Sequence, residues 1–202
     1  MAEDVKRSMI SIAEYIQRAA SEIDPESVNR FLKILTAALA NKRKILVVGA
    51  GRSGLVAKAF AMRLMHLGFN VYVVGETITP SIGEGDVLIA VSGSGSTQIV
   101  ISVASAAKTV KATVVAITSF EDSPLAKISD HVVKIPGRTK VAAETDYFAR
   151  QVLGIYEPIA PLGTLFEDTV MLFFDGVVLA LMNILGLEEG HLKSRHANVE
   201  FV

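Results

Sequence analysis

The fold of this chain is decided by residues 45–68, ILVVGAGRSGLVAKAFAMRLMHLG. Residues 45–48 form an apolar run that is too short for a stable helix and typical of a strand buried on both faces of a sheet. The glycine-rich residues 49–54 predict a tight turn, and residues 55–67 predict a helix that ends at Gly68, because glycine commonly terminates helices. A buried strand that leads through a turn into a helix is the repeating unit of a parallel α/β sheet.

The same alternation continues along the chain. Further strands are predicted at residues 71–74, 87–91, 112–118 and 131–135, with a helix at about 97–109 and a short turn around Ser123-Pro124. Strands that are buried on both faces and alternate with helices form a parallel sheet between two helical layers. We therefore predict an α/β fold, a three-layer αβα sandwich with a doubly wound five-stranded sheet in the order 2-1-3-4-5, as in flavodoxin.

Helical patterns flank the predicted sheet. Apolar residues at three- and four-residue spacing predict a helix over about residues 5–19, and Asp24-Pro25 predicts the start of a second helix that ends near Asn41. A short helix at 147–153, a long apolar helix at 164–185 and a short terminal helix follow the sheet. We predict a single domain over residues 1–202, with N-terminal helices at 1–41, the sheet core at 44–136, and C-terminal helices and a tail at 146–202.

Charge and cysteine content exclude several classes of function. The 202 residues include 20 basic and 21 acidic side chains, so the net charge of −1 argues against a nucleic-acid partner, which would call for a basic surface. The absence of cysteine excludes disulfides and thiolate metal sites. No paired His/Glu spacing indicates a metal ion either.

Hydrophobic content bears on location and assembly. The start, MAEDVKRSMI, is unlike a signal peptide. The longest apolar run, residues 170–185, is shorter than a membrane span and contains Asp175, so we expect a buried helix. The sequence thus predicts a cytoplasmic protein with no membrane partner. Half of its residues are hydrophobic, which favours a homo-oligomer.

Two loops at the predicted carboxyl ends of strands contain groups that bind phosphate. Residues 49–54, GAGRSG, match the dinucleotide-binding pattern G-x-G-x-x-G, and Glu76 lies near the spacing of its ribose-binding carboxylate. Residues 92–97, SGSGST, supply hydroxyls and helix-start N–H groups that suit a phosphate monoester. An ordinary Gly/Ser connection would explain the second loop if it stood alone. Because the two strands flank the point where the strand order reverses, the loops together predict a ligand site.

Both loops resemble those of sugar isomerase (SIS) domains. SGSGST at 92–97 resembles their S-x-S-G-x-T phosphate loop, and GAGRSG at 49–54 resembles their first loop. The resemblance covers nearly the whole chain and is stronger for one branch, the 6-phospho-3-hexuloisomerases. Four segments are similar to characteristic stretches of that branch: residues 51–54, 61–64, 161–167 and 195–198.

The resemblance implies a reaction and an assembly. The reaction is the interconversion of D-arabino-hex-3-ulose 6-phosphate and D-fructose 6-phosphate in the ribulose monophosphate pathway, which serves formaldehyde fixation or, in reverse, pentose supply. The assembly is a homotetramer that needs no cofactor.

The expected catalytic groups are a carboxylate and a histidine. Moving a carbonyl to the adjacent carbon needs a base that removes a proton from that carbon and returns one to the carbon that carried the original carbonyl, through an enediolate. Glu167 is the first choice, although its position near a helix start alone also fits a carboxylate that the helix dipole favours. Glu76 is the second carboxylate to consider. In related aminosugar isomerases a neighbouring subunit's histidine opens the sugar ring, and we assign that role to His196, in its own site or a neighbour's.

Arg52, inside the first loop, can reach a phosphate or a sugar hydroxyl. Glu76 can bind hydroxyls or be an ordinary loop charge. His66 and Asp175 lie among apolar helical residues and are expected to be buried or partly buried polar groups without a chemical role. The predicted substrate-binding residues are Gly51, Arg52, Ser53, Ser92, Gly93, Ser94, Thr97 and Glu76.

Other functions stay open on the sequence. Some SIS isomerases act on arabinose or sedoheptulose phosphates, and SIS domains in some transcription regulators bind a sugar phosphate without catalysis. A nicotinamide-dependent oxidoreductase would use G-x-G-x-x-G but would leave the Ser/Thr loop unexplained.

Overall fold

The computed structural model describes residues 2–137, 164–188 and 190. Five parallel strands form one sheet in the order β2-β1-β3-β4-β5, which confirms the predicted strand order. The predicted helix at 147–153 and the tail lie outside the described residues. The strands are β1 (Lys44–Gly49), β2 (Asn70–Val73), β3 (Val87–Val91), β4 (Thr113–Thr118) and β5 (His131–Lys134).

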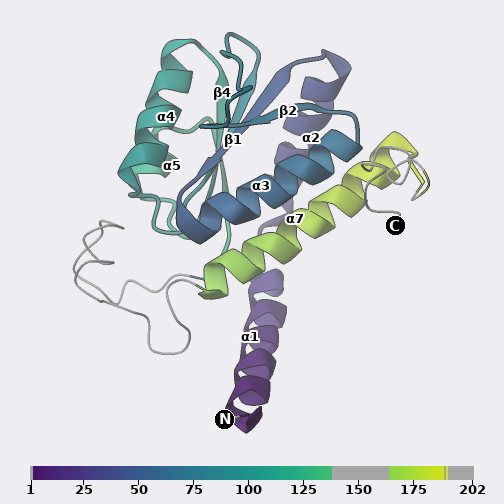
Figure 1. Ribbon diagram of the computed structural model, residues 1–202, viewed down its shortest axis with the longest axis vertical. Helices are drawn as coiled ribbons and strands as arrows, with labels where there is room; N and C mark the ends of the chain where they lie inside the picture. Colours follow the sequence, from purple (N-terminus) through teal and green to yellow (C-terminus); the bar gives the residue numbers. More distant parts are fainter. Residues whose placement is uncertain (1, 138–163, 189, 191–202) are drawn as a thin grey trace.

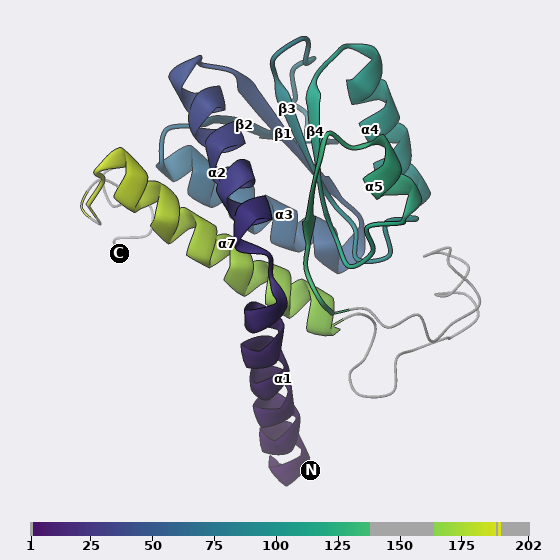
Figure 2. The ribbon, with the colours of Figure 1, turned by 180° about the vertical axis from the view of Figure 1, so that it is seen from behind.

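Helices cover both faces of the sheet, so the three-layer αβα sandwich is confirmed (Figure 1). Helices α2, α3 and α7 lie on one face, and α4 and α5 lie on the other. Helix α1 extends away from the sheet in both views (Figure 1, Figure 2), and Ala19 is its one buried residue. The described helices are α1 (Ala2–Glu22), α2 (Pro25–Ala40), α3 (Gly51–His66), α4 (Gln98–Thr109), α5 (Pro124–Ile128) and α7 (Thr164–Leu185).

The core consists of two apolar clusters separated by the sheet. Successive side chains of a strand point to opposite faces. In β1, Ile45 and Val47 therefore pack toward α2, α3 and α7, whereas Leu46 and Val48 pack toward α4 and α5. This double burial explains why the strands read as continuous apolar runs rather than as alternating patterns.

Several predicted boundaries are confirmed, and one is wrong. The Asp24 carboxylate caps α2 by accepting hydrogen bonds from the backbone N–H groups of Glu26 and Ser27, and Pro25 is the first helical residue. Helix α3, however, begins at Gly51 and not after residue 54. A Cβ atom on Gly54 would lie 2.8 Å from the Gly49 carbonyl oxygen, so this glycine serves the close packing of helix on strand instead of a turn.

A second difference concerns the connection between β4 and β5. The segment around Ser123-Pro124 was predicted as a turn, but it opens the five-residue helix α5. The Ser123 hydroxyl accepts a hydrogen bond from the Ala126 N–H, and the proline occupies the first helical turn, where its missing N–H costs nothing. A serine followed by proline is a typical helix start, so the sequence contained the signal for this helix.

Helix α7 packs into the core along one side. By length and composition it is the one helix of the described chain that could cross a membrane, but its Phe174 ring stacks on Phe60 of α3 with centroids 4.0 Å apart. The expected burial holds for that side only, because Leu172 and Leu179 on other sides are more than half exposed. Asp175 is exposed too, contrary to expectation, although it borders a small pocket between α3 and α7.

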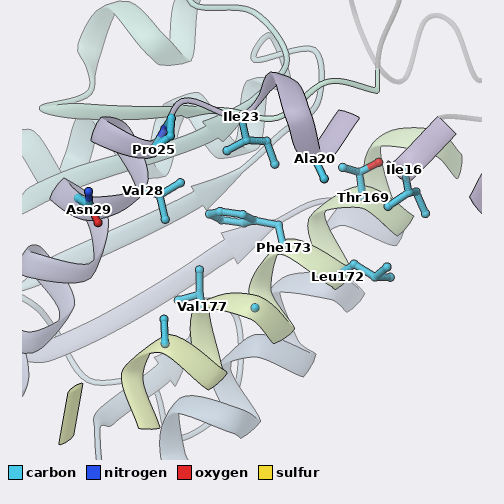
Figure 3. Close-up of a pocket in the computed structure, with 12 residues that line it drawn as sticks. Ile16, Ala20, Ile23, Pro25, Val28, Asn29, Thr169, Leu172, Phe173 and Val177 are labelled. Carbon is cyan, nitrogen blue, oxygen red and sulfur yellow. The ribbon is translucent and has the colours of Figure 1, made fainter. Parts of the chain in front are cut away.

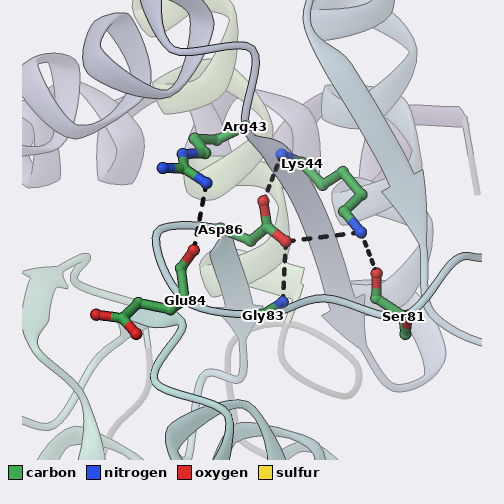
Figure 4. Close-up of polar contacts among 6 residues, drawn as sticks. All are labelled: Arg43, Lys44, Ser81, Gly83, Glu84 and Asp86. Atoms are coloured by element: carbon green, nitrogen blue, oxygen red, sulfur yellow. Dashed lines mark hydrogen bonds and ion pairs between the residues drawn. The ribbon is translucent and has the colours of Figure 1, made fainter.

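Two carboxylates tie together the amino ends of the strands. Asp86 directly precedes β3 and accepts hydrogen bonds of 2.9 Å from the backbone N–H groups of Lys44 and Gly83 (Figure 4). Asp130 directly precedes β5 and accepts a 2.8 Å hydrogen bond from the Val114 N–H. Burial opposes ionisation of Asp130, but hydrogen bonds from Lys108 and Val114 outweigh it and lower the pKa of its carboxyl. This edge of the sheet is therefore stabilised by charge, opposite the edge that carries the two loops.

Candidate functional site

The two loops predicted to bind phosphate lie at one edge of the sheet. Strands β1 and β3 are parallel neighbours, with Gly49 opposite Val91 in register. The segments that follow these two residues therefore leave the sheet side by side. Ligands of open α/β sheets bind at this kind of edge, where neighbouring strands lead to helices on opposite faces.

The loop after β3 is held by its own hydroxyls. The Oγ atom of Ser92 lies 2.9 Å from Oγ1 of Thr97, and both side chains are buried. Gly95 has φ +61°, and a Cβ atom there would lie 2.1 Å from Ser123 Oγ, so only glycine fits. The Thr97 hydroxyl does not cap α4, so the first N–H groups of that helix, at Gln98 and Ile99, can face an anion, whereas the Val100 N–H donates to the Thr97 carbonyl. Ser94 Oγ accepts a 3.3 Å hydrogen bond from the Ser96 N–H.

Gly51 and Gly93, both predicted to bind substrate, shape the two loops. Gly51 has φ +56°, a left-handed conformation that suits glycine, at the point where β1 passes into α3. The Gly93 carbonyl accepts a 3.1 Å hydrogen bond from the Ser119 N–H, which ties this loop to the end of β4.

Glu167 is buried where two helices begin. It lies in the first turn of α7 with 4% of its surface exposed, and its Oε1 atom accepts a 3.1 Å hydrogen bond from Ser53 Oγ at the start of α3. Helices α3 and α7 run parallel, because their starts meet here and Phe60 meets Phe174 farther along (Figure 1). The positive ends of both helix dipoles therefore favour the carboxylate.

Arg52 connects Glu167 to a residue that the sequence analysis missed. Its Nε atom lies 3.6 Å from Oε2 of Glu167, and its Nη2 atom donates a 3.0 Å hydrogen bond to Oδ1 of Asp168. Arg52 is about half exposed, so its guanidinium group borders both solvent and the buried carboxylate. Asp168 adjoins Glu167 in sequence, but nothing in the sequence pairs it with an arginine 116 positions away.

Glu76 lies apart from these contacts. It follows β2, on the opposite side of β1 from β3, and its Oε1 atom is 2.6 Å from Nζ of Lys58. Both side chains of this ion pair are half exposed. Within the described chain Glu76 contacts none of the other predicted site residues, so its present geometry fits a surface ion pair.

The two histidines that the sequence singled out differ in whether the structure describes them. His196 lies outside the described residues. His66 is buried as expected. Within residues 2–137, 164–188 and 190, no group of three His, Asp or Glu side chains could hold a metal ion.

An apolar groove of about 470 Å³ lies elsewhere, between α1, α2 and α7 (Figure 3). Its lining contains no charged residue, and its polar members are Asn29 and Thr169. A groove without an acid or base cannot transfer a proton, so this groove is not the candidate active site. The buried Glu167 beside Ser53 and Arg52, together with the strand-end loops, is the candidate.

Comparisons with known proteins identify the family of this chain. The model of the SIS domain family matches residues 38–156, more than half of the chain. An uncharacterized protein of Aeropyrum pernix is 56% identical over 200 residues, which cover 99% of this chain and 94% of that protein. The 3-hexulose-6-phosphate isomerase of Bacillus subtilis is 43% identical over 162 residues, which cover 80% of this chain and 83% of that enzyme.

A solved structure is similar to this chain over nearly its whole length. The protein MJ1247 of Methanococcus jannaschii, whose structure infers a function of 3-hexulose-6-phosphate isomerase, superposes with a TM-score of 0.74 and 31% identity. The match covers 97% of this chain and 98% of that one. The chain described here therefore belongs to the SIS domain family, alongside relatives named 3-hexulose-6-phosphate isomerase.

Proposed function

We propose that this protein is a sugar-phosphate isomerase that interconverts D-arabino-hex-3-ulose 6-phosphate and D-fructose 6-phosphate in the ribulose monophosphate pathway. The observation that carries the proposal is the buried Glu167, which the Ser53 hydroxyl holds at the amino ends of α3 and α7. The names of the Bacillus subtilis enzyme and of the Methanococcus jannaschii structure support this choice of substrate.

In the proposed reaction Glu167 is the base. Fructose 6-phosphate has its carbonyl at C2, and the Glu167 carboxylate removes the proton from C3 to leave a 2,3-enediolate. The same group returns the proton to C2, while the O3 hydroxyl proton moves to O2 and the carbonyl forms at C3. The hydrogen bond from Ser53 fixes the orientation of the carboxylate during both transfers. Because oxidation and reduction occur within one molecule, the reaction needs no external redox cofactor.

The remaining groups would bind the substrate. The hydroxyls and N–H groups of residues 92–97, including Ser92, Ser94 and Thr97, would hold the phosphate at the start of α4. The guanidinium group of Arg52 would stabilise the enediolate oxygen, because a cation next to the developing charge lowers the barrier. For His196 the proposed role is opening of the fructose 6-phosphate ring.

We propose a homotetramer as the active form. Val5, Met9 and Ile10 on α1 are each more than half exposed, although a folded monomer would normally shield such side chains. The apolar groove in Figure 3 lies between the other end of this helix, α2 and α7, so a neighbouring subunit could cover apolar side chains at both places.

A substrate panel tests the proposed reaction. The hexulose phosphate would be made in place from ribulose 5-phosphate and formaldehyde by a synthase, and fructose 6-phosphate would be measured as product. Arabinose 5-phosphate and sedoheptulose 7-phosphate would be offered in parallel. Conversion of one of those two sugars alone would assign a different isomerase, and thermal stabilisation by a sugar phosphate without any conversion would assign a binding module. Stabilisation by NAD(H) alone would favour the oxidoreductase.

A further inference from the structure

We propose that Asp168 is a positioning residue that controls the strength of Glu167 as a base by occupying one end of the Arg52 guanidinium group. The inference rests on the proposed function, because it concerns the proton transfer assigned to Glu167. Among Arg52, Glu167 and Asp168, which form two ion pairs, Asp168 is the one residue without a proposed role so far.

The argument begins with the geometry of the guanidinium group. Nε and Nη2 of an arginine form one edge, and a single carboxylate ordinarily takes both atoms with two parallel hydrogen bonds. Here two carboxylates share that edge. Asp168 Oδ1 lies 3.0 Å from Nη2, within hydrogen-bond distance, whereas Glu167 Oε2 lies 3.6 Å from Nε, which is beyond it.

The consequence concerns the protonation of Glu167. A two-point pair with arginine would stabilise its ionised form and make it a weaker base. Asp168 prevents that pair by holding Nη2, and its own negative charge also opposes ionisation of its neighbour. Glu167 is 4% exposed, so water screens these effects little.

Arg52 and Asp168 are the charged groups that the described contacts place beside Glu167. From α3 its charged contact is Arg52, and Ser53 is neutral. The surfaces of α1 and α2 that face α7 line the groove in Figure 3, which contains no charged residue. Arg52 makes no other ion pair or hydrogen bond within the part of the chain that the structure describes. Removing Asp168 therefore leaves Glu167 as the one carboxylate partner of Arg52 among the described residues.

The test measures isomerase activity against pH for the full-length protein and for Asp168→Asn. We expect the acid limb of the kcat/KM profile to move by about one unit to lower pH, as for a carboxylate that gains a cationic partner. Because a weaker base transfers protons more slowly, kcat should fall about 3- to 10-fold, with KM changed less than about twofold. Asp168→Glu should restore the wild-type profile, since it restores the charge.

Matched variants separate this role from a structural one. Asp175→Asn makes the same change at an exposed position of the same helix and should leave the profile unchanged. If Asp168→Asn fails to fold, Asp168→Ser also removes the charge and should show the same shift. An active wild-type protein whose profile superposes on that of Asp168→Asn would overturn the positioning role alone. A wild-type protein that does not convert the hexulose phosphate would instead overturn the proposed function.

Discussion

Replacing Glu167 by glutamine removes the proposed base and its charge but keeps the shape of the side chain. The glutamine oxygen can still accept the 3.1 Å hydrogen bond from Ser53, and its amide nitrogen would take the place of Oε2, 3.6 Å from the Arg52 Nε. That distance is too long for a hydrogen bond, so the exchange breaks none there. Loss of the charge also removes the ion pair with Arg52 and forfeits the favourable helix dipole, which is worth about 0.3–1 kcal/mol per helix end and which a stable domain tolerates.

The expected effect on catalysis is much larger than that on stability. A positioned acid–base group contributes roughly 10²- to 10⁴-fold, so kcat of Glu167→Gln should fall by at least about 10². Affinity for fructose 6-phosphate should survive, because residues 92–97 and the start of α4 are unchanged. Glu188→Gln makes the same substitution at an exposed position beyond α7 and should match the wild-type protein.

Solvent-deuterium exchange reports on the base directly. In deuterium oxide the wild-type protein should incorporate deuterium at C3 of fructose 6-phosphate, which proton NMR detects as loss of that signal. Glu167→Gln should incorporate none on the same timescale. Exchange at the wild-type rate would show that Glu167 is not the base, and Glu76 would then be the next carboxylate to replace.

Three further predictions concern binding, assembly and stability. Ser92→Ala and Thr97→Ala should each weaken fructose 6-phosphate binding by about 10- to 150-fold, the value of a hydrogen bond to a charged group, and unchanged titrations would place the phosphate elsewhere. Light scattering should give four times the 21.6 kDa chain mass, and a monomer at micromolar protein would contradict the assembly. Burial lowers the pKa of His131, outweighing its hydrogen bond with the Ser27 carbonyl, so protonation favours the unfolded chain. Its stabilising contribution is present above pH 6.5 and is lost as pH falls through the lower folded pKa. In urea unfolding, the free energy of unfolding of His131→Gln should lose that part of its pH dependence. A pH dependence equal to that of the wild-type protein would refute the role of His131.

The sheet was predictable because its signals are local. Apolar runs of four to six residues, glycine at helix ends and the Asp24-Pro25 start each reflect the conformation of a few neighbouring residues. The strand order also followed, since few arrangements of five parallel strands are common. The early start of α3 was missed because Gly51 and Gly54 read as turn residues, although the packing of α3 against β1 is what requires Gly54.

The candidate site was predictable in its parts but not in its contacts. Glu167 and Ser53 were both proposed, yet their hydrogen bond joins residues 114 positions apart and depends on how α7 lies along α3. The period of a single helix fixes which side is apolar and leaves the partner of that side open. Asp168 was missed for the same reason, because its role depends on an arginine brought close by that packing.

The packing of α3 also explains why a dinucleotide fingerprint occurs in an SIS domain. A Cβ atom on Gly49 would lie 2.8 Å from the Ser53 carbonyl oxygen, so the glycines let the helix start approach the strand closely. In a dinucleotide-binding domain that start would face the pyrophosphate. Here the residues between the glycines, Arg52 and Ser53, contact the α7 carboxylates instead, and the buried Glu167 accepts a hydrogen bond from Ser53 at the start of α3. A pyrophosphate bound there would meet a buried carboxylate of the same sign, and this repulsion favours a neutral part of a substrate, such as the carbons of a sugar, next to Glu167.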